Sequence, residues 1–189
     1  MGEYADATAH FQQGLEIFNT IQGKFNTPDV LGYLGSIALL QGNAKQAALY
    51  FNERLSMVRE LKNKASIANA LCDLGIALGH LGNDAHATTL LREGLALSQE
   101  INNLYLIAAC LTGLAIIPQP PRRVFQMLAA AQAAFAQSGK FINPLYRVVH
   151  ERAENRIREG LNAQDFSKLL EESSAMTVEQ AVALALEEM

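Results

Sequence analysis

The side chains that most often carry catalysis or bind metals are few in this chain and far apart. Its four histidines are His10, His80, His86 and His150. None stands in a His-x-x-x-His pair or a His-Glu-x-x-His motif, the spacings at which two imidazoles on one helix bind zinc. His80 and His86 flank a predicted turn, where they could approach one another, but surface histidines are the more ordinary interpretation. His150 and Glu154 have the four-residue spacing of a pair on one helix face.

Nucleophilic side chains also lack the partners that would activate them. Ser36, Ser66 and Ser98 have no nucleophile-elbow motif around them. Cys72 and Cys110 lie in apolar helical stretches without the spacing of a metal site, which predicts two buried free thiols.

Acidic pairs and glycines add no catalytic signal. Neighbouring acids, such as those at 171–172 and 187–188, point in different directions on a helix. The thirteen glycines are scattered singly, so the chain has no glycine-rich phosphate loop. The sequence therefore predicts a protein that is not an enzyme and that has no cofactor and no metal.

Composition narrows the classes of partner. The chain has 189 residues, half of them hydrophobic, and a net charge of −4. Basic residues concentrate between Lys140 and Arg158, but Glu151, Glu154 and Glu159 interleave with them, which argues against a nucleic-acid interface. No apolar run is long enough to span a membrane, and no secretory leader opens the chain. We expect a cytoplasmic protein without direct nucleic-acid or membrane contacts.

The helices that must position these residues are predicted from a sequence pattern that repeats every 40 residues. Apolar and small residues recur in step, as in Gly2, Gly42 and Gly82; Ala7, Ala47 and Ala87; Phe11, Phe51 and Leu91; Leu15, Leu55 and Leu95; Leu34, Leu74 and Leu114; Gly35, Gly75 and Ala115. Within each unit the apolar residues have helical spacing, and no segment alternates like a strand. This pattern predicts an all-α solenoid of helical hairpins.

Turn and cap residues mark the predicted helix ends. Gly82 is expected to take a left-handed conformation, and Asn83 to accept a backbone N–H at the start of the next helix. Asn43 and Gln46 have the spacing of a capping box one unit earlier. Thr27-Pro28-Asp29 predicts another helix start. The small residues of the series at Gly35 are expected to let paired helices approach closely.

These residues resemble the tetratricopeptide (TPR) consensus. Leu71, Leu74-Gly75, Leu78, Gly82, Ala87 and Leu91 carry the resemblance, and the unit before repeats it. The resemblance implies a right-handed α-α superhelix, with longer helices than the usual 34-residue unit. We expect TPR-like repeats of about 40 residues over 1–119.

The last third resembles the C-terminal region of bacterial LuxR-type and other predicted-ATPase (signal-transduction ATPase) regulators. The resemblance rests on three stretches, 123–131, 144–156 and 176–186. Leu170 stands where that family commonly has Trp, and Ser173-Ser174 where it has Gly. Thr177 and Gln180 independently predict a capping box. We expect residues 120–189 to hold a repeat remnant and capping helices.

The TPR resemblance also implies a concave groove lined by the first helix of each hairpin. Its expected residues are Asp29, Gly32, Ser36, Asn69, Cys72, Ile76, Ala109, Thr112 and Ile116. This set is small and weakly polar, so a protein or peptide, or a small apolar effector, is the expected partner. Alternatively, the small residues serve only to let neighbouring helices pack.

The chain begins in the phase of a second repeat helix, because Gly2 aligns with Gly42. We expect Met1 to start a fragment whose repeats continue upstream. The alternative is a natural short protein whose first helix packs on later helices or on a second copy. Either way, Phe11, Leu15 and Phe18 are expected to form a self-association face.

Two functional hypotheses follow. The first is a non-enzymatic interaction or ligand-sensing scaffold, the C-terminal sensor part of a larger transcriptional or signalling ATPase regulator, as the resemblance implies. The second is a stand-alone TPR adaptor or a homodimerising assembly module.

Overall fold

The computed structural model describes residues 2–20, 27–173 and 176–187, and this part of the chain forms ten α-helices and no strand. The prediction of an all-α fold is therefore confirmed. The helices are α1 (Gly2–Thr20), α2 (Thr27–Leu40), α3 (Ala44–Leu61), α4 (Lys64–His80), α5 (Asp84–Glu100), α6 (Leu104–Ala115), α7 (Pro121–Ser138), α8 (Pro144–Gly160), α9 (Ala163–Ser173) and α10 (Val178–Leu186). None of the described helices is long and apolar enough to cross a membrane.

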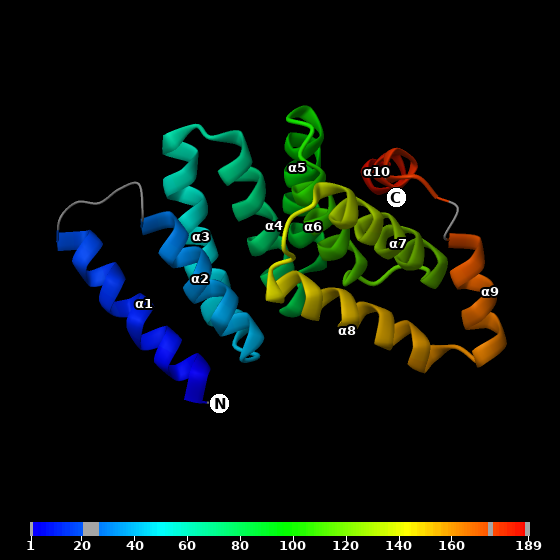
Figure 1. Ribbon diagram of the computed structural model, residues 1–189, viewed down its shortest axis with the longest axis horizontal. Coiled ribbons are helices and arrows are strands. Elements are labelled where there is room, and N and C mark those ends of the chain that lie inside the picture. The colour runs from blue at the N-terminus through cyan, green and yellow to red at the C-terminus, as the bar shows by residue number, and fades with distance from the viewer. Residues whose placement is uncertain (1, 21–26, 174–175, 188–189) are drawn as a thin grey trace.

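Consecutive helices pack against one another from α1 to α8 (Figure 1). The closest pairs include α2 with α3, α4 with α5, and α6 with α7, which are the pairs expected of helical hairpins. α8 departs from this order, because it contacts α2 and α6 as well as its neighbour α7. It thereby brings the last third of the chain against the first hairpin.

An asparagine stands at the N-cap of every helix from α3 to α6, at intervals of 20 residues. These caps are Asn43, Asn63, Asn83 and Asn103. The side chains of all but Asn83 accept a hydrogen bond from the backbone N–H three residues on. The expected cap bond of Asn83 is thus wrong, although the residue holds the predicted position. The left-handed turn is confirmed at Gly82, where φ is 75°.

Two glycines 40 residues apart make room for a large side chain of the following helix. A Cβ added to Gly35 would lie 2.4 Å from the Phe51 ring, and one added to Gly75 would lie 2.6 Å from Leu91 Cγ. Phe51 and Leu91 are both fully buried. The predicted close approach of paired helices is confirmed at these positions.

The last helix, α10, is held at both of its ends. Its start has the predicted capping box, in which Gln180 N–H donates to Thr177 Oγ1 at 3.2 Å and Thr177 N–H donates to Gln180 Oε1 at 3.0 Å. At its end, Arg92 Nε donates to the Ala185 carbonyl at 2.9 Å, and Arg123 donates to the Leu184 carbonyl. Cations at this end of a helix also offset its dipole. α10 packs against α5, α6 and α7.

Candidate functional site

Four of the nine expected groove residues meet around one cavity of about 170 Å³, which we call the groove cavity. α2 supplies Asp29, Gly32 and Ser36, and α4 supplies Asn69. Four further residues complete its lining: Tyr33, Arg54, Asp73 and Asn143. The groove cavity therefore lies where α2, α3 and α4 meet the loop before α8.

The other five expected groove residues do not line this cavity. Cys72, Ile76, Ala109 and Thr112 are fully buried, and Ile116 is half-buried. They lie on α4 and α6, apart from Ile116, which directly follows α6, and α6 is covered by both α7 and α8. Cys72 and Cys110 are free thiols inside this core, as predicted.

A closed set of hydrogen bonds, which we call the polar cluster, forms the floor of the groove cavity. Arg54 donates to Asp73 Oδ2 at 2.5 Å and to Asn69 Oδ1 at 2.7 Å. The Tyr146 hydroxyl donates to Asp73 Oδ1 at 2.8 Å and accepts from Asn69 Nδ2 at 2.7 Å. The polar cluster thus joins α3, α4 and α8.

Burial dominates the electrostatics of the polar cluster. The Arg54 and Asp73 side chains are only 9% and 6% exposed. Burial raises the pKa of Asp73 above its ordinary value, and the Arg54 charge and the Tyr146 hydroxyl oppose this shift. Burial also raises the pKa of Tyr146, and the nearby Asp73 charge adds to the effect. Tyr146 is therefore a neutral donor to Asp73.

Gly32 leaves the space that the Arg54 guanidinium occupies. A Cβ added to Gly32 would lie 3.1 Å from both Arg54 Cζ and Nε. The Nε atom is buried and has no hydrogen-bond partner in the described part of the chain. An unpaired buried donor of this kind costs free energy, so the arrangement is not explained by stability alone.

Arg54 and Asp73 escaped the sequence analysis, although the repeat carried a signal for both. Arg54 stands where the other units have Gly14 and Gly94, and Asp73 stands where the next unit has Gly113. At the Arg54 position the other units have only glycine, whereas at the Asp73 position the unit before has Tyr33. Charged residues at positions that are uncharged in the other units depart from the repeat, and these two departures mark the polar cluster.

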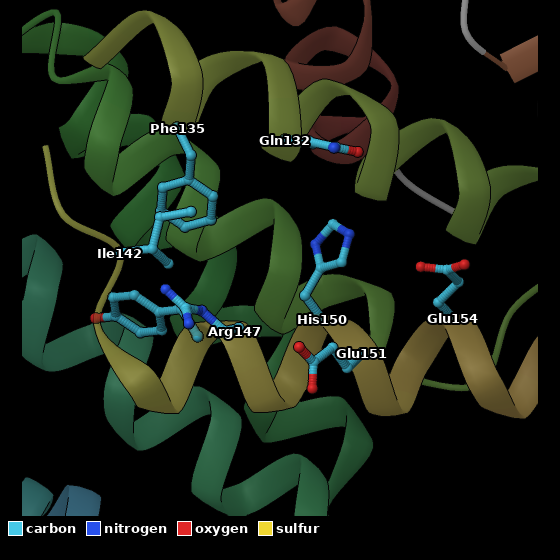
Figure 2. A pocket seen from close by; sticks show the side chains of 8 residues that line it. Gln132, Phe135, Ile142, Arg147, His150, Glu151 and Glu154 are labelled. Carbon is cyan, nitrogen blue, oxygen red and sulfur yellow. The ribbon is translucent and has the colours of Figure 1, made fainter. Parts of the chain in front are cut away.

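A second cavity, of about 230 Å³, lies between α7 and α8, and we call it the α7–α8 pocket. Figure 2 shows His150 in its middle, Phe135 and Ile142 toward one end, and Glu154 toward the other. The remaining lining residues are Gln132, Tyr146, Arg147 and Glu151. Tyr146 therefore belongs to both places, because its hydroxyl is part of the polar cluster.

The expected self-association face is described only in part. Phe11 and Leu15 on α1 are half-buried, and Phe11 stacks on Tyr33 with ring centroids 5.0 Å apart. The Phe18 side chain lies outside the described residues. Among the residues that the structure does describe, no three or more His, Cys, Asp and Glu are placed to hold a metal ion.

The fold and the groove cavity together define an all-α domain of sequentially packed helices with a buried, charged floor beneath a small cavity. No protein-family model, curated protein or solved structure matches the chain.

Proposed function

We propose that this chain is a non-enzymatic scaffold that recognises a small polar ligand, or a polar side chain of a protein partner, in the groove cavity. The groove cavity itself is the observation that supports the proposal. Three polar residues meet there above a buried ion pair: Asp29, Ser36 and Asn69. The 40-residue register assigns all three to the groove-lining face of the first helix in each hairpin. Convergent polar groups in a concave site are the usual mark of ligand recognition.

The lining favours a polar ligand, with a hydrogen-bond donor for the Asp29 carboxylate and an acceptor for the Asn143 amide. Arg54 and Asp73 neutralise each other, so Asp29 at the rim gives the groove cavity a net negative charge. Asn143 already uses its side-chain oxygen to cap α8, which leaves its amide NH₂ group as a donor. This polar lining favours a polar ligand over the apolar effector that the sequence suggested.

The wider role that we propose rests on resemblance. A TPR-like superhelix at the C-terminal end of an ATPase regulator would act as the sensor of that regulator. A ligand in the groove cavity would contact α2 and α4 as well as the loop before α8, so it could favour one arrangement of these elements over another. Such a difference in affinity between states is what a sensor requires.

Blocking the groove cavity tests the proposal. Ser36→Leu should fill the cavity from a half-buried position on α2, whereas Ser56→Leu places the same side chain on an exposed part of α3. The free proteinogenic amino acids and their amides serve as probes in NMR titrations of the whole chain. We expect at least one probe to shift the Gly32, Tyr33 and Ser36 amides saturably, and we expect Ser36→Leu alone to abolish the shift. No saturable shift at these amides, or a shift that survives in Ser36→Leu, would contradict the proposal.

A homodimerising module is the second candidate, favoured by one comparison within the repeat. Phe11 and Leu15 are half-buried, whereas their counterparts one and two units later are at most 4% exposed. α1 also exposes Tyr4 and Ile17 by 44% and 54%. An apolar helix face that is left half covered is a ready contact for a second copy.

A further inference from the structure

We propose that the α7–α8 pocket is a separate binding site for a small amphipathic amine. The apolar body of the amine would lie against Phe135, Ile142 and Tyr146, and its ammonium group would lie toward Glu154. The inference rests on the division of this pocket into an apolar end and an acidic end (Figure 2). It does not depend on the groove cavity.

The apolar end is a rigid wall of aromatic rings. The Phe135 and Tyr146 rings stack with centroids 6.3 Å apart and an interplanar angle of 21°. Tyr105 meets both rings edge-on, at 5.4 Å and 6.0 Å. Phe135 and Tyr146 are 3% and 1% exposed, so their positions are fixed before any ligand arrives. An apolar group in the pocket would therefore touch the two rings over a small area and would pack mainly on the half-buried Ile142, with little reorganisation of the wall.

Two carboxylates line the pocket, Glu154 at one end and Glu151 nearer the middle (Figure 2). Glu154 is half-buried, and its Oε1 accepts a hydrogen bond from Arg158 at 2.8 Å, which leaves its second oxygen as an acceptor. Glu151 lines the same pocket one helical turn earlier. On the α7 side, Gln132 is the polar residue that lines the pocket, and it carries no charge.

His150 does not offset these carboxylates. Burial lowers the pKa of His150 from its ordinary value, and Glu154 and Glu151 only partly oppose the shift. The imidazole is therefore neutral at pH 7 and can accept or donate one hydrogen bond.

The cation that lines the pocket, Arg147, is directed away from the acidic end. Its guanidinium lies 5.7 Å from the centroid of the Phe141 ring, on the side of the pocket that holds Ile142 (Figure 2). Arg158, the ion-pair partner of Glu154, is 60% exposed and does not line the pocket, so solvent screens its charge. The carboxylates of the lining therefore still favour an ammonium group over an alcohol or a carboxylate.

The test compares three probes that share one apolar body. Phenethylamine, 2-phenylethanol and phenylacetate differ only in a cationic, neutral or anionic head group. In NMR titrations of the whole chain, we expect phenethylamine to shift amides of α7 and α8 saturably, about fivefold more tightly than 2-phenylethanol, as one partly exposed charge contact allows. Phenylacetate should bind more weakly than 2-phenylethanol. Equal affinity of amine and alcohol, tighter binding of phenylacetate, or shifts outside α7 and α8 would overturn the proposal.

Two matched variants test the acidic end. Glu154→Gln should weaken phenethylamine about fivefold and leave 2-phenylethanol unchanged, because only the ammonium group needs the charge. Glu159→Gln removes an exposed charge from the same helix outside the pocket, and it should change neither probe. If Glu154→Gln and Glu159→Gln weakened phenethylamine equally, the effect would come from the overall charge of the protein, and the proposed site would be overturned.

Ile142→Ser tests the apolar end. Ile142 is a half-buried loop residue, so its replacement should leave the helices folded. It should weaken phenethylamine and 2-phenylethanol by the same factor, because both probes have the same phenyl group. If Ile142→Ser bound phenethylamine and 2-phenylethanol as tightly as the native chain does, this result would also contradict the proposed site.

Discussion

Arg54 and Asp73 are the two charged residues that are buried in the described part of the chain. Desolvating two charges costs several kcal/mol each, and a well-packed apolar pair of similar size is often as stable or more so. Asn69 and Tyr146 hydrogen-bond to the pair, which lies on the floor of a cavity, but Arg54 Nε has no partner in the described part of the chain. We infer that the pair is retained for recognition, because its contribution to stability does not explain it.

Removing one member of this pair should be strongly destabilising. Asp73→Asn leaves the Arg54 guanidinium buried without a counter-charge, so we expect the free energy of unfolding to fall by about 3 kcal/mol. Urea denaturation measures this change. Glu93→Gln breaks the exposed ion pair of Arg59 and Glu93, and should cost less than about 1 kcal/mol. Similar losses in the two variants would mean that Arg54 finds another partner, or water, in the folded protein.

Because its pKa is lowered in the folded chain, His150 is expected to make the protein less stable in mild acid. Its pKa is lowered in the folded chain because burial disfavours the charged imidazolium. As the pH falls below the ordinary histidine pKa, the unfolded chain therefore takes up a proton first, and stability is lost. We expect the free energy of unfolding to fall more between pH 7.5 and about pH 5.5 in the native chain than in His150→Gln. Parallel pH profiles of the two proteins would rule out this role for His150.

The residues of the groove cavity show how far the sequence could predict a site. The TPR-like register put Asp29, Gly32 and Ser36 on one helix face, and all three line the groove cavity, because helical spacing is a local property. It could not separate them from Cys72 and Thr112, which have the same register but are buried. That difference depends on α8, whose contacts with α2 come from more than a hundred residues further along the chain.

At the scale of the element, Gly35 and Gly75 determine how closely the two helices of a hairpin pack; we call these two positions the glycine notches. Gly35→Ala would drive a Cβ into the rigid, fully buried Phe51 ring at 2.4 Å. We expect a net loss of about 2 kcal/mol of unfolding free energy from this overpacking. Gly14→Ala, on α1, meets nothing within 4 Å and should instead gain about 0.5–1 kcal/mol from higher helix propensity. Equal effects of the two substitutions in thermal or urea unfolding would argue against the notch.

Helix ends were predicted well where a single residue type decides them. The left-handed conformation of Gly82 and the Thr177 capping box follow from local backbone chemistry. The asparagine caps at Asn63 and Asn103 were not predicted, because the prediction rested on the 40-residue period and these caps repeat every 20 residues. The path of α8 across α2 and α6 has no local signal, since it depends on which surface remains uncovered after the hairpins have packed.

At the scale of the whole molecule, we expect α1 to decide whether the chain associates with itself. We expect the native chain to gain mass with concentration in light scattering, because Phe11 and Leu15 are only half covered. Phe11→Glu should keep it monomeric by placing a charge on this face. Gln12→Glu adds the same charge at an exposed position of α1 and should leave the association unchanged. A native chain that stays monomeric at tens of micromolar would exclude the homodimerising module.

The order in which the helices pack also has a mechanical consequence. α1 packs chiefly on α2, whereas α8 ties the first hairpin to the last third of the chain through Tyr146 and the polar cluster. A force applied between the two ends of the chain would therefore peel α1 away at low load, with little effect on the rest. The next barrier would be the rupture of the contacts between α8 and the first two hairpins. Until those contacts break, the applied force would act on the polar cluster, which forms the floor of the groove cavity. Tension along the chain would then change ligand affinity at the cavity, and a bound ligand would change the force needed to break the contacts.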